Sequence, residues 1–170
     1  QGHEVLVIHN SHCYPRVIHE IPEKLKKSLA ARMGFAISDY DAVKEKEYQD
    51  NGVKVFRLPI KKFIPHSQPS DNVIKRQVNK IVATLKKEKF EPDVITGHWA
   101  SPQMEIISEL KTIYHCKTAV VLHGTGYIES PKFNAEEYLK NIDSLGARSL
   151  SQAKQIKEIL KLDKLPFVCN

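Results

Sequence analysis

The chain has 170 residues, of which 41% are hydrophobic and 27% charged, an ordinary composition for one domain or one lobe of a larger protein. No run approaches the roughly 20 apolar residues of a membrane-spanning helix, so we expect no segment that crosses a bilayer. Cys13, Cys116 and Cys169 are widely spaced and form no CxxC pair. With no secretory signal, they predict free thiols and a cytoplasmic protein.

The net charge of +6 comes from 26 Lys and Arg against 20 Asp and Glu, and the basic residues cluster. Solvated helix faces are one interpretation, and an anionic membrane surface or a nucleic acid are others. Because no RNP-type aromatic motif, zinc finger or arginine-rich segment is present, we expect no nucleic-acid partner. Peripheral contact with the inner face of an anionic membrane stays open, with Lys24, Lys26, Lys27 and Arg32 as the first cluster to consider.

Apolar runs and helical spacing alternate along the first half of the chain. Residues 1–3, "QGH", resemble the remnant of a cleaved tag, which leaves 4–170 as a single domain. Gly34 is placed to end a helix, and Asn51–Gly52 to form a turn. The expected elements are a strand at 4–10, a helix at 22–34, a short strand at 35–41, a charged loop at 42–52 and a strand at 53–60.

The second half has the stronger signals. Ser70 is the expected N-cap of an amphipathic helix whose apolar face carries Ile74, Val78, Ile81 and Leu85. Ser101–Pro102 predicts an N-cap and a first-turn proline for a helix that turns Met104, Ile107 and Leu110 inward, and Asn134–Glu137 has capping-box spacing. The remaining elements are strands at 93–99, 117–124, 143–149 and 165–170 and a helix at 151–160.

This alternation predicts an α/β fold with a Rossmann-like parallel sheet and helices on both faces. Val94–Thr96 and Ala119–Leu122 are continuous apolar runs, as strands covered on both faces are. In such sheets ligands bind beyond the carboxyl ends of the strands. We therefore take the residues after each strand as the candidate site.

Three strand ends deliver a histidine. The first is followed by His9, Asn10, Ser11 and His12, the second by Gly97, His98 and Trp99, and the third by His123, Gly124, Thr125 and Gly126. One such histidine is commonly only a structural hydrogen-bond partner, Trp99 can cap a core, and the glycines can serve a turn. If all three ends share one rim, a binding or catalytic site becomes an equal alternative.

Several enzyme classes lack their motifs here. "HNSHCYPRVIHE" after the first strand has no glycine, which argues against a dinucleotide-binding fingerprint. There is no Walker lysine loop and no GxSxG elbow. The histidines form no HExxH or other close pair on a predicted helix, so we expect no metal site.

The phrases "VKVFRLPI", "EPDVITGHW", "KTAVVLHGTG", "IDSLGARSLSQAKQIKEIL" and "LPFVCN" resemble, in this order, the amino-terminal domain of family 4 glycosyltransferases of the GT-B fold. The resemblance covers the chain from residue 4 onward. We take "EVLVIHN" as the family's first strand. The alternative is the family's second strand, with the first one missing.

The resemblance implies the acceptor-binding lobe of a retaining glycosyltransferase, which moves a sugar from a nucleotide-sugar donor to a glycan or lipid-linked acceptor without an obligatory metal or other cofactor. The donor lobe would follow Asn170, and the isolated fragment would be inactive. His123 matches the family's catalytic-site histidine, and Gly124, Thr125, His98 and Trp99 match acceptor-side positions. Asn10, His12 and Arg16 lie in the loop after the first strand, where "YPRVIHE" replaces the family's Gly-Gly turn.

Two other functions remain open at this point. One is a stand-alone module for a sugar or anion, or a non-catalytic glycosyltransferase subunit. The other is a sugar-nucleotide epimerase of related fold, which would act without an acceptor. The sequence does not identify the donor sugar, the acceptor or the linkage.

Overall fold

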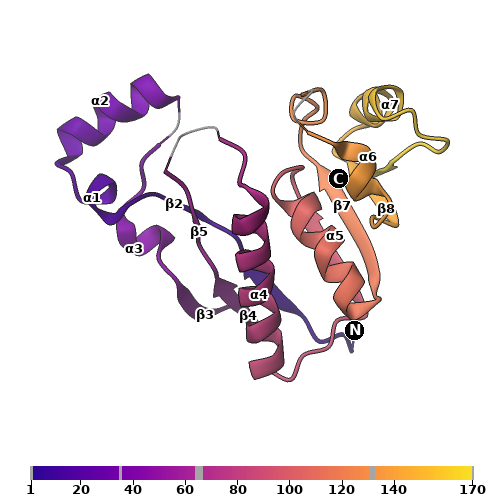
Figure 1. The fold of residues 1–170 in the computed structure, drawn as a ribbon, viewed down its shortest axis with the longest axis horizontal. Helices are drawn as coiled ribbons and strands as arrows, with labels where there is room; N and C mark the ends of the chain where they lie inside the picture. The colour runs from indigo at the N-terminus through magenta and orange to yellow at the C-terminus, as the bar shows by residue number, and fades with distance from the viewer. Residues whose placement is uncertain (1, 35, 64–66, 131–132, 170) are drawn as a thin grey trace. The chain divides into compact units, whose positions relative to one another are not determined.

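A computed structural model describes residues 2–34, 36–63, 67–130 and 133–169. The chain is an α/β protein that divides into two compact units, 1–73 and 74–170 (Figure 1). The predicted α/β class with a parallel, helix-flanked sheet is confirmed.

Unit 1 contains two small sheets. Strand β1 (Leu6–His9) runs parallel to β4 (Val53–Arg57), and β3 (Lys46–Asp50) pairs antiparallel with the other edge of β4. The short strands β2 (His12–Cys13) and β5 (Ile60–Lys61) form a parallel pair of their own.

The charged loop predicted for residues 42–52 is wrong, because β3 occupies its middle, Lys46–Asp50. Asn51 and Gly52 have φ of 48° and 80°, the left-handed pair that a two-residue hairpin turn requires. The turn was therefore predicted correctly. Strand β3 carries polar and charged side chains on an exposed edge, so it has no alternation of apolar residues by which to recognise it.

The strand predicted for residues 35–41 is also wrong within the described residues 36–41. Residues 36–39 are irregular, and α3 (Tyr40–Val43) follows them. The ring of the buried His19 hydrogen-bonds the backbone here. Its Nε2 atom accepts a hydrogen bond from the Tyr14 N–H at 3.0 Å, so Nδ1 carries the proton and donates to the Ser38 carbonyl at 2.8 Å. A side chain thus satisfies the carbonyl that a strand partner would otherwise satisfy.

Two helices precede this segment, α1 (Arg16–His19) and α2 (Glu23–Met33). Helix α2 ends at Gly34, whose φ of 71° is left-handed, as predicted. Lys26 is only 7% exposed and forms an ion pair with Asp39. The predicted basic cluster is thus corrected, because Lys26 is not available to a membrane surface while Lys24, Lys27 and Arg32 are exposed.

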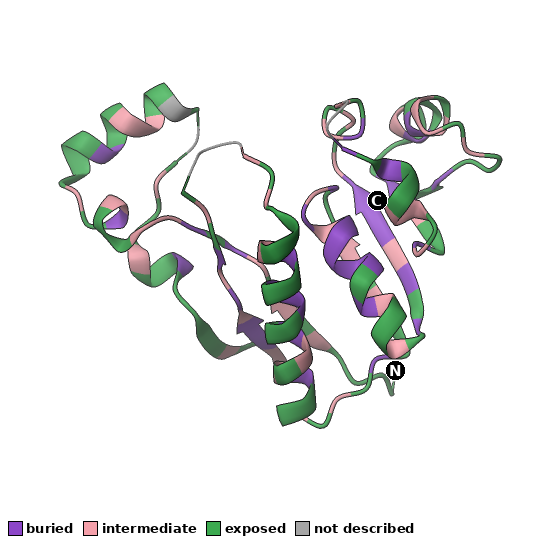
Figure 2. Cartoon of the chain, viewed as in Figure 1, coloured by how far each residue is buried: buried purple, intermediate pink, exposed green. Residues whose placement is uncertain are grey.

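Unit 2 is built on a four-stranded parallel sheet in the order β6-β7-β8-β9. Helix α5 packs on β6 and β7, and α7 packs on β8 and β9. The core joins fully buried residues of these elements, including Met104, Val120 and Ile156. Figure 2 shows the buried positions, in purple, along β7 and on α5. The elements are α4 (Asp71–Lys87), β6 (Val94–His98), α5 (Gln103–Tyr114), β7 (Lys117–Leu122), α6 (Ala135–Leu139), β8 (Ser144–Ala147), α7 (Leu150–Ile159) and β9 (Phe167–Val168).

The predicted apolar faces of the helices are confirmed, but one of the predicted caps is wrong. Ile74, Val78, Ile81 and Leu85 on α4 are buried, as are Met104, Ile107 and Leu110 on α5. The N-cap of α5 is Pro102 and not Ser101, whose hydroxyl hydrogen-bonds the Glu105 carboxylate instead. Asn134 does cap α6, although its amide donates to the Glu137 carboxylate and not to the backbone.

The amino-terminal edge of the sheet is fastened by one carboxylate. Asp143, just before β8, accepts hydrogen bonds from the Thr118 N–H at 2.8 Å and the Thr118 hydroxyl at 3.1 Å, and it pairs with the Lys111 ammonium. The lysine and these donors hold the pKa of Asp143 at about 2. The beginnings of β7 and β8 and the end of α5 are thereby fixed together, at the edge opposite the candidate site.

Helix α5 lies so close to β6 at position 97 that a side chain there would displace the Ile107 side chain. A Cβ built on Gly97 would come within 2.4 Å of the Ile107 Cδ1 methyl, and Ile107 is itself buried. The residue before His98 is thus chosen by the packing of α5 on the sheet, and not by a turn.

We predict that Gly97→Ala lowers the free energy of unfolding by about 1–3 kcal/mol, as overpacking of a filled core does. Ile107→Val removes the methyl in question, so the double variant should recover part of that loss. Urea denaturation of the two single variants and the double variant measures this coupling. Strictly additive losses would show that the Gly97–Ile107 contact is not the cause.

Candidate functional site

Two predicted site histidines meet at the carboxyl edge of the unit 2 sheet. β6 ends at His98 and β7 ends one residue before His123. The His98 Nδ1 atom lies 2.9 Å from the His123 Nε2 atom, so the two rings share one N–H as donor and acceptor. The prediction that these two strand ends converge is confirmed.

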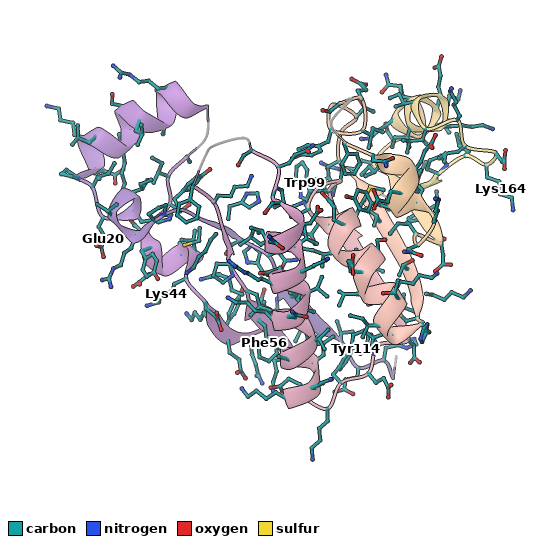
Figure 3. All side chains as sticks on the ribbon, viewed as in Figure 1. Glu20, Lys44, Phe56, Trp99, Tyr114 and Lys164 are labelled. Atoms are coloured by element: carbon teal, nitrogen blue, oxygen red, sulfur yellow. The ribbon has the colours of Figure 1, made fainter. Side chains whose placement is uncertain are left out.

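Trp99 completes this cluster. Its ring stacks on the His123 ring, with 4.4 Å between centroids and 21° between planes. Trp99 is 59% exposed, and Figure 3 labels its side chain. Trp99 is thus exposed and does not cap the core of unit 2.

The backbone of Trp99 is strained. Its φ is 75°, a left-handed conformation that costs a bulky residue about 1–3 kcal/mol. A hydrogen bond of 2.9 Å from the Trp99 N–H to the Val121 carbonyl holds it there, and the next residue, Ala100, is buried. Backbone strain that leaves a large aromatic ring exposed does not stabilise the fold. Such strain is common at binding sites.

His123 is held in its neutral form. Partial burial is the main cause that lowers its pKa from the ordinary value, followed by the positive charges of His98 and Arg148. The lowered pKa favours the neutral ring over the imidazolium. Because His98 occupies Nε2, the nitrogen left for a ligand is Nδ1 of His123.

The two glycines that follow are not required by the backbone. Neither Gly124 nor Gly126 has a left-handed φ, and a Cβ on either would find no atom within 4 Å. The tight-turn interpretation is therefore not supported. Next to them, the Thr125 carbonyl accepts a hydrogen bond from the Glu129 N–H, so Thr125 helps to order this loop. Open space beside a glycine backbone is suited to the close approach of a ligand.

The other predicted site residues, Asn10, His12 and Arg16, belong to unit 1. Asn10 lies between β1 and β2, and His12 begins β2. Burial, with a smaller contribution from Lys62, lowers the pKa of His12 to about 4. Arg16 is already paired with Glu20, the residue that follows α1. Strands β1 and β2 belong to sheets other than the one that contains β6 and β7. That Asn10, His12 and Arg16 share a rim with His98 and His123 therefore stays a prediction.

Sequence reasoning missed Arg148 and Ser149. They follow β8, in the same sheet and at the same edge as His123. The rule applied to the other strand ends would have found them. They were missed because only strand ends that carry a histidine were taken as candidates.

No protein-family model matches the chain, and no curated protein matches it in sequence. Within the described residues, no three His, Cys, Asp or Glu side chains are grouped as metal ligands would be. No described helix is both long and apolar enough to span a membrane.

We predict that His123 becomes protonated only below the ordinary histidine pKa of about 6.5. Because its folded pKa is lowered, its contribution to stability is present above the unfolded value and is lost as the pH falls toward the folded one. His98→Asn should move the pKa of His123 upward by removing one neighbouring charge. NMR titration of the ring protons measures both values.

The single tryptophan of the sequence offers an independent measure of His123 protonation, because a protonated imidazole stacked on an indole quenches the indole fluorescence. Fluorescence of Trp99 should fall along the same titration curve as the His123 ring signals. A His123 pKa above 6.5 in the unmodified chain would contradict the electrostatics described here.

Proposed function

We propose that this chain is the acceptor-binding lobe of a retaining glycosyltransferase of the GT-B type, similar to family 4, which transfers a sugar from a nucleotide-sugar donor to a glycan or lipid-linked acceptor. The observation that carries the proposal is the His98–Trp99–His123 cluster at the carboxyl edge of a parallel sheet. The motifs quoted above and the open space beside Gly124 support it.

The cluster suits sugar chemistry. The exposed ring of Trp99 offers an apolar face to the C–H groups of a sugar. The Nδ1 atom of the neutral His123 can exchange a hydrogen bond with a sugar hydroxyl, and His98 fixes the orientation of that ring from the other side.

In glycosyl transfer, positive charge develops on the donor sugar and negative charge on the leaving phosphate. A neutral His123 does not oppose the charge on the sugar as an imidazolium would. Its role in this proposal is to hold the acceptor hydroxyl beside the reacting sugar and to stabilise the transition state by one hydrogen bond, and it need not remove the proton itself. The nucleotide-sugar site belongs to a second lobe in this proposal.

We predict that His123→Asn, introduced into the protein encoded by the complete reading frame, lowers turnover by about a hundredfold or more, the scale of one lost transition-state hydrogen bond. The matched control is His115→Asn. His115 is exposed, and its left-handed φ of 52° is one that asparagine tolerates. A screen of nucleotide-sugar donors with sugar acceptors measures transfer.

Unchanged turnover in His123→Asn would remove His123 from the mechanism. Sugar binding without transfer, in a reading frame that encodes no donor lobe, would favour the alternative of a binding module or non-catalytic subunit. Epimerisation or hydrolysis of the donor without an acceptor would favour the epimerase.

A membrane partner is a separate part of the proposal and rests on unit 1. Helix α2 exposes Lys24 and Lys27 beside Leu25, which is 58% exposed. Basic residues beside an exposed apolar side chain are suited to an anionic lipid surface.

We predict that the chain sediments with anionic vesicles at low salt, and that Lys24→Gln with Lys27→Gln weakens this by about tenfold or more, at roughly 1 kcal/mol for each lysine. The control is the same change at Lys154 and Lys164, two exposed lysines of unit 2. Equal losses in both pairs would mean attraction by net charge alone. If the chain stays in the supernatant, the membrane proposal is wrong and a soluble acceptor is favoured.

A further inference from the structure

Arg148 is the cation nearest in register to His123. In the parallel pairing of β7 with β8, Leu122 lies opposite Ala147. His123 and Arg148 are the next residue of each strand, so they emerge side by side at the carboxyl edge, where adjacent strands are about 4.8 Å apart. The two groups interact electrostatically.

The backbone at Arg148 is fixed while its side chain is left exposed. Its N–H donates to the Gln152 Oε1 atom at 2.8 Å, and the Ser149 hydroxyl accepts from the Gln152 N–H at 3.1 Å. The guanidinium makes no ion pair with any residue in the described part of the chain. The group is thus held at the site by its main chain and keeps its charge uncompensated.

An unpaired arginine does not help to hold a neutral sugar beside a histidine, but it matches an anion well. The planar guanidinium offers two parallel N–H donors to the oxygens of a phosphate or carboxylate. We propose that Arg148 forms an anionic subsite next to His123, and that the acceptor is a sugar or polyol that carries a phosphate group. This inference rests on the proposed function and names the acceptor class for the same site.

The subsite has a consequence for His123 that can be measured. The positive charge of Arg148 contributes to the lowered pKa of His123. A bound phosphate compensates that charge, so it raises the pKa of His123, and Arg148→Gln raises it without phosphate. Linkage requires that the two effects are not additive, because phosphate has little left to compensate in the variant.

The test is NMR titration of the His123 ring protons in the 170-residue chain, with and without inorganic phosphate. Phosphate should raise the pKa in the unmodified chain and bind about tenfold or more weakly to Arg148→Gln, the loss expected for a charged hydrogen-bonded pair. Arg148→Lys should keep part of the effect. The control is Lys154→Gln, which removes one exposed charge from α7 and should keep all of it.

Equal weakening in Arg148→Gln and Lys154→Gln, or no effect of phosphate on His123, would overturn the subsite. Transfer by the full protein to neutral acceptors, with no preference for phosphorylated ones, would also overturn it and leave the proposed function standing. Absence of any transfer, with the phosphate effect on His123 intact, would instead overturn the glycosyltransferase and keep an anion site.

Discussion

The candidate site depends on the parallel pairing of β6 with β7 and on its continuation by one residue. The ladder places His98 opposite Val121, and the Trp99 N–H then donates to the Val121 carbonyl beyond the end of the strand. That bond fixes Trp99 in a left-handed conformation, which turns its ring onto His123. A different register would separate the two histidines and remove the stacking.

The same sheet is held from both sides. At its amino-terminal edge, Asp143 ties Thr118 and Lys111 together. On its face, α5 approaches so closely that a Cβ at position 97 would displace the buried Ile107 side chain. The carboxyl edge can therefore carry a strained residue and uncompensated positive charge, because the stability of unit 2 comes from its core and from the opposite edge.

Periodicity and strand ends were enough to predict most of unit 2. The apolar faces of α4 and α5 followed from the helical spacing of their apolar residues, which tertiary packing reinforces. The meeting of His98 with His123 followed from the positions at which their strands end. Unit 1 was predicted less well. Strand β3 is charged and lies at an edge, and residues 36–39 take their conformation partly from His19, a contact 19 residues distant in sequence.

Other features could not be read from local patterns at all. Lys26 stands among exposed basic residues in the sequence of α2, yet it is buried and forms an ion pair with Asp39. The φ of Trp99 comes from the hydrogen bond to Val121, in a different strand, and propensity alone argues against it. Both features depend on contacts distant in sequence, and one of them, the φ of Trp99, lies at the candidate site.

The central claim is that the carboxyl edge of the β6–β7–β8 sheet binds a sugar. The most direct measurement is chemical-shift mapping of the 170-residue chain with a panel of sugars and sugar phosphates, since its one tryptophan gives a single indole N–H signal. The account predicts saturable shifts of the Trp99 indole, of the His98 and His123 rings, and of the Gly124 amide. Saturable shifts confined to other parts of the chain, or none at all across the panel, would contradict it.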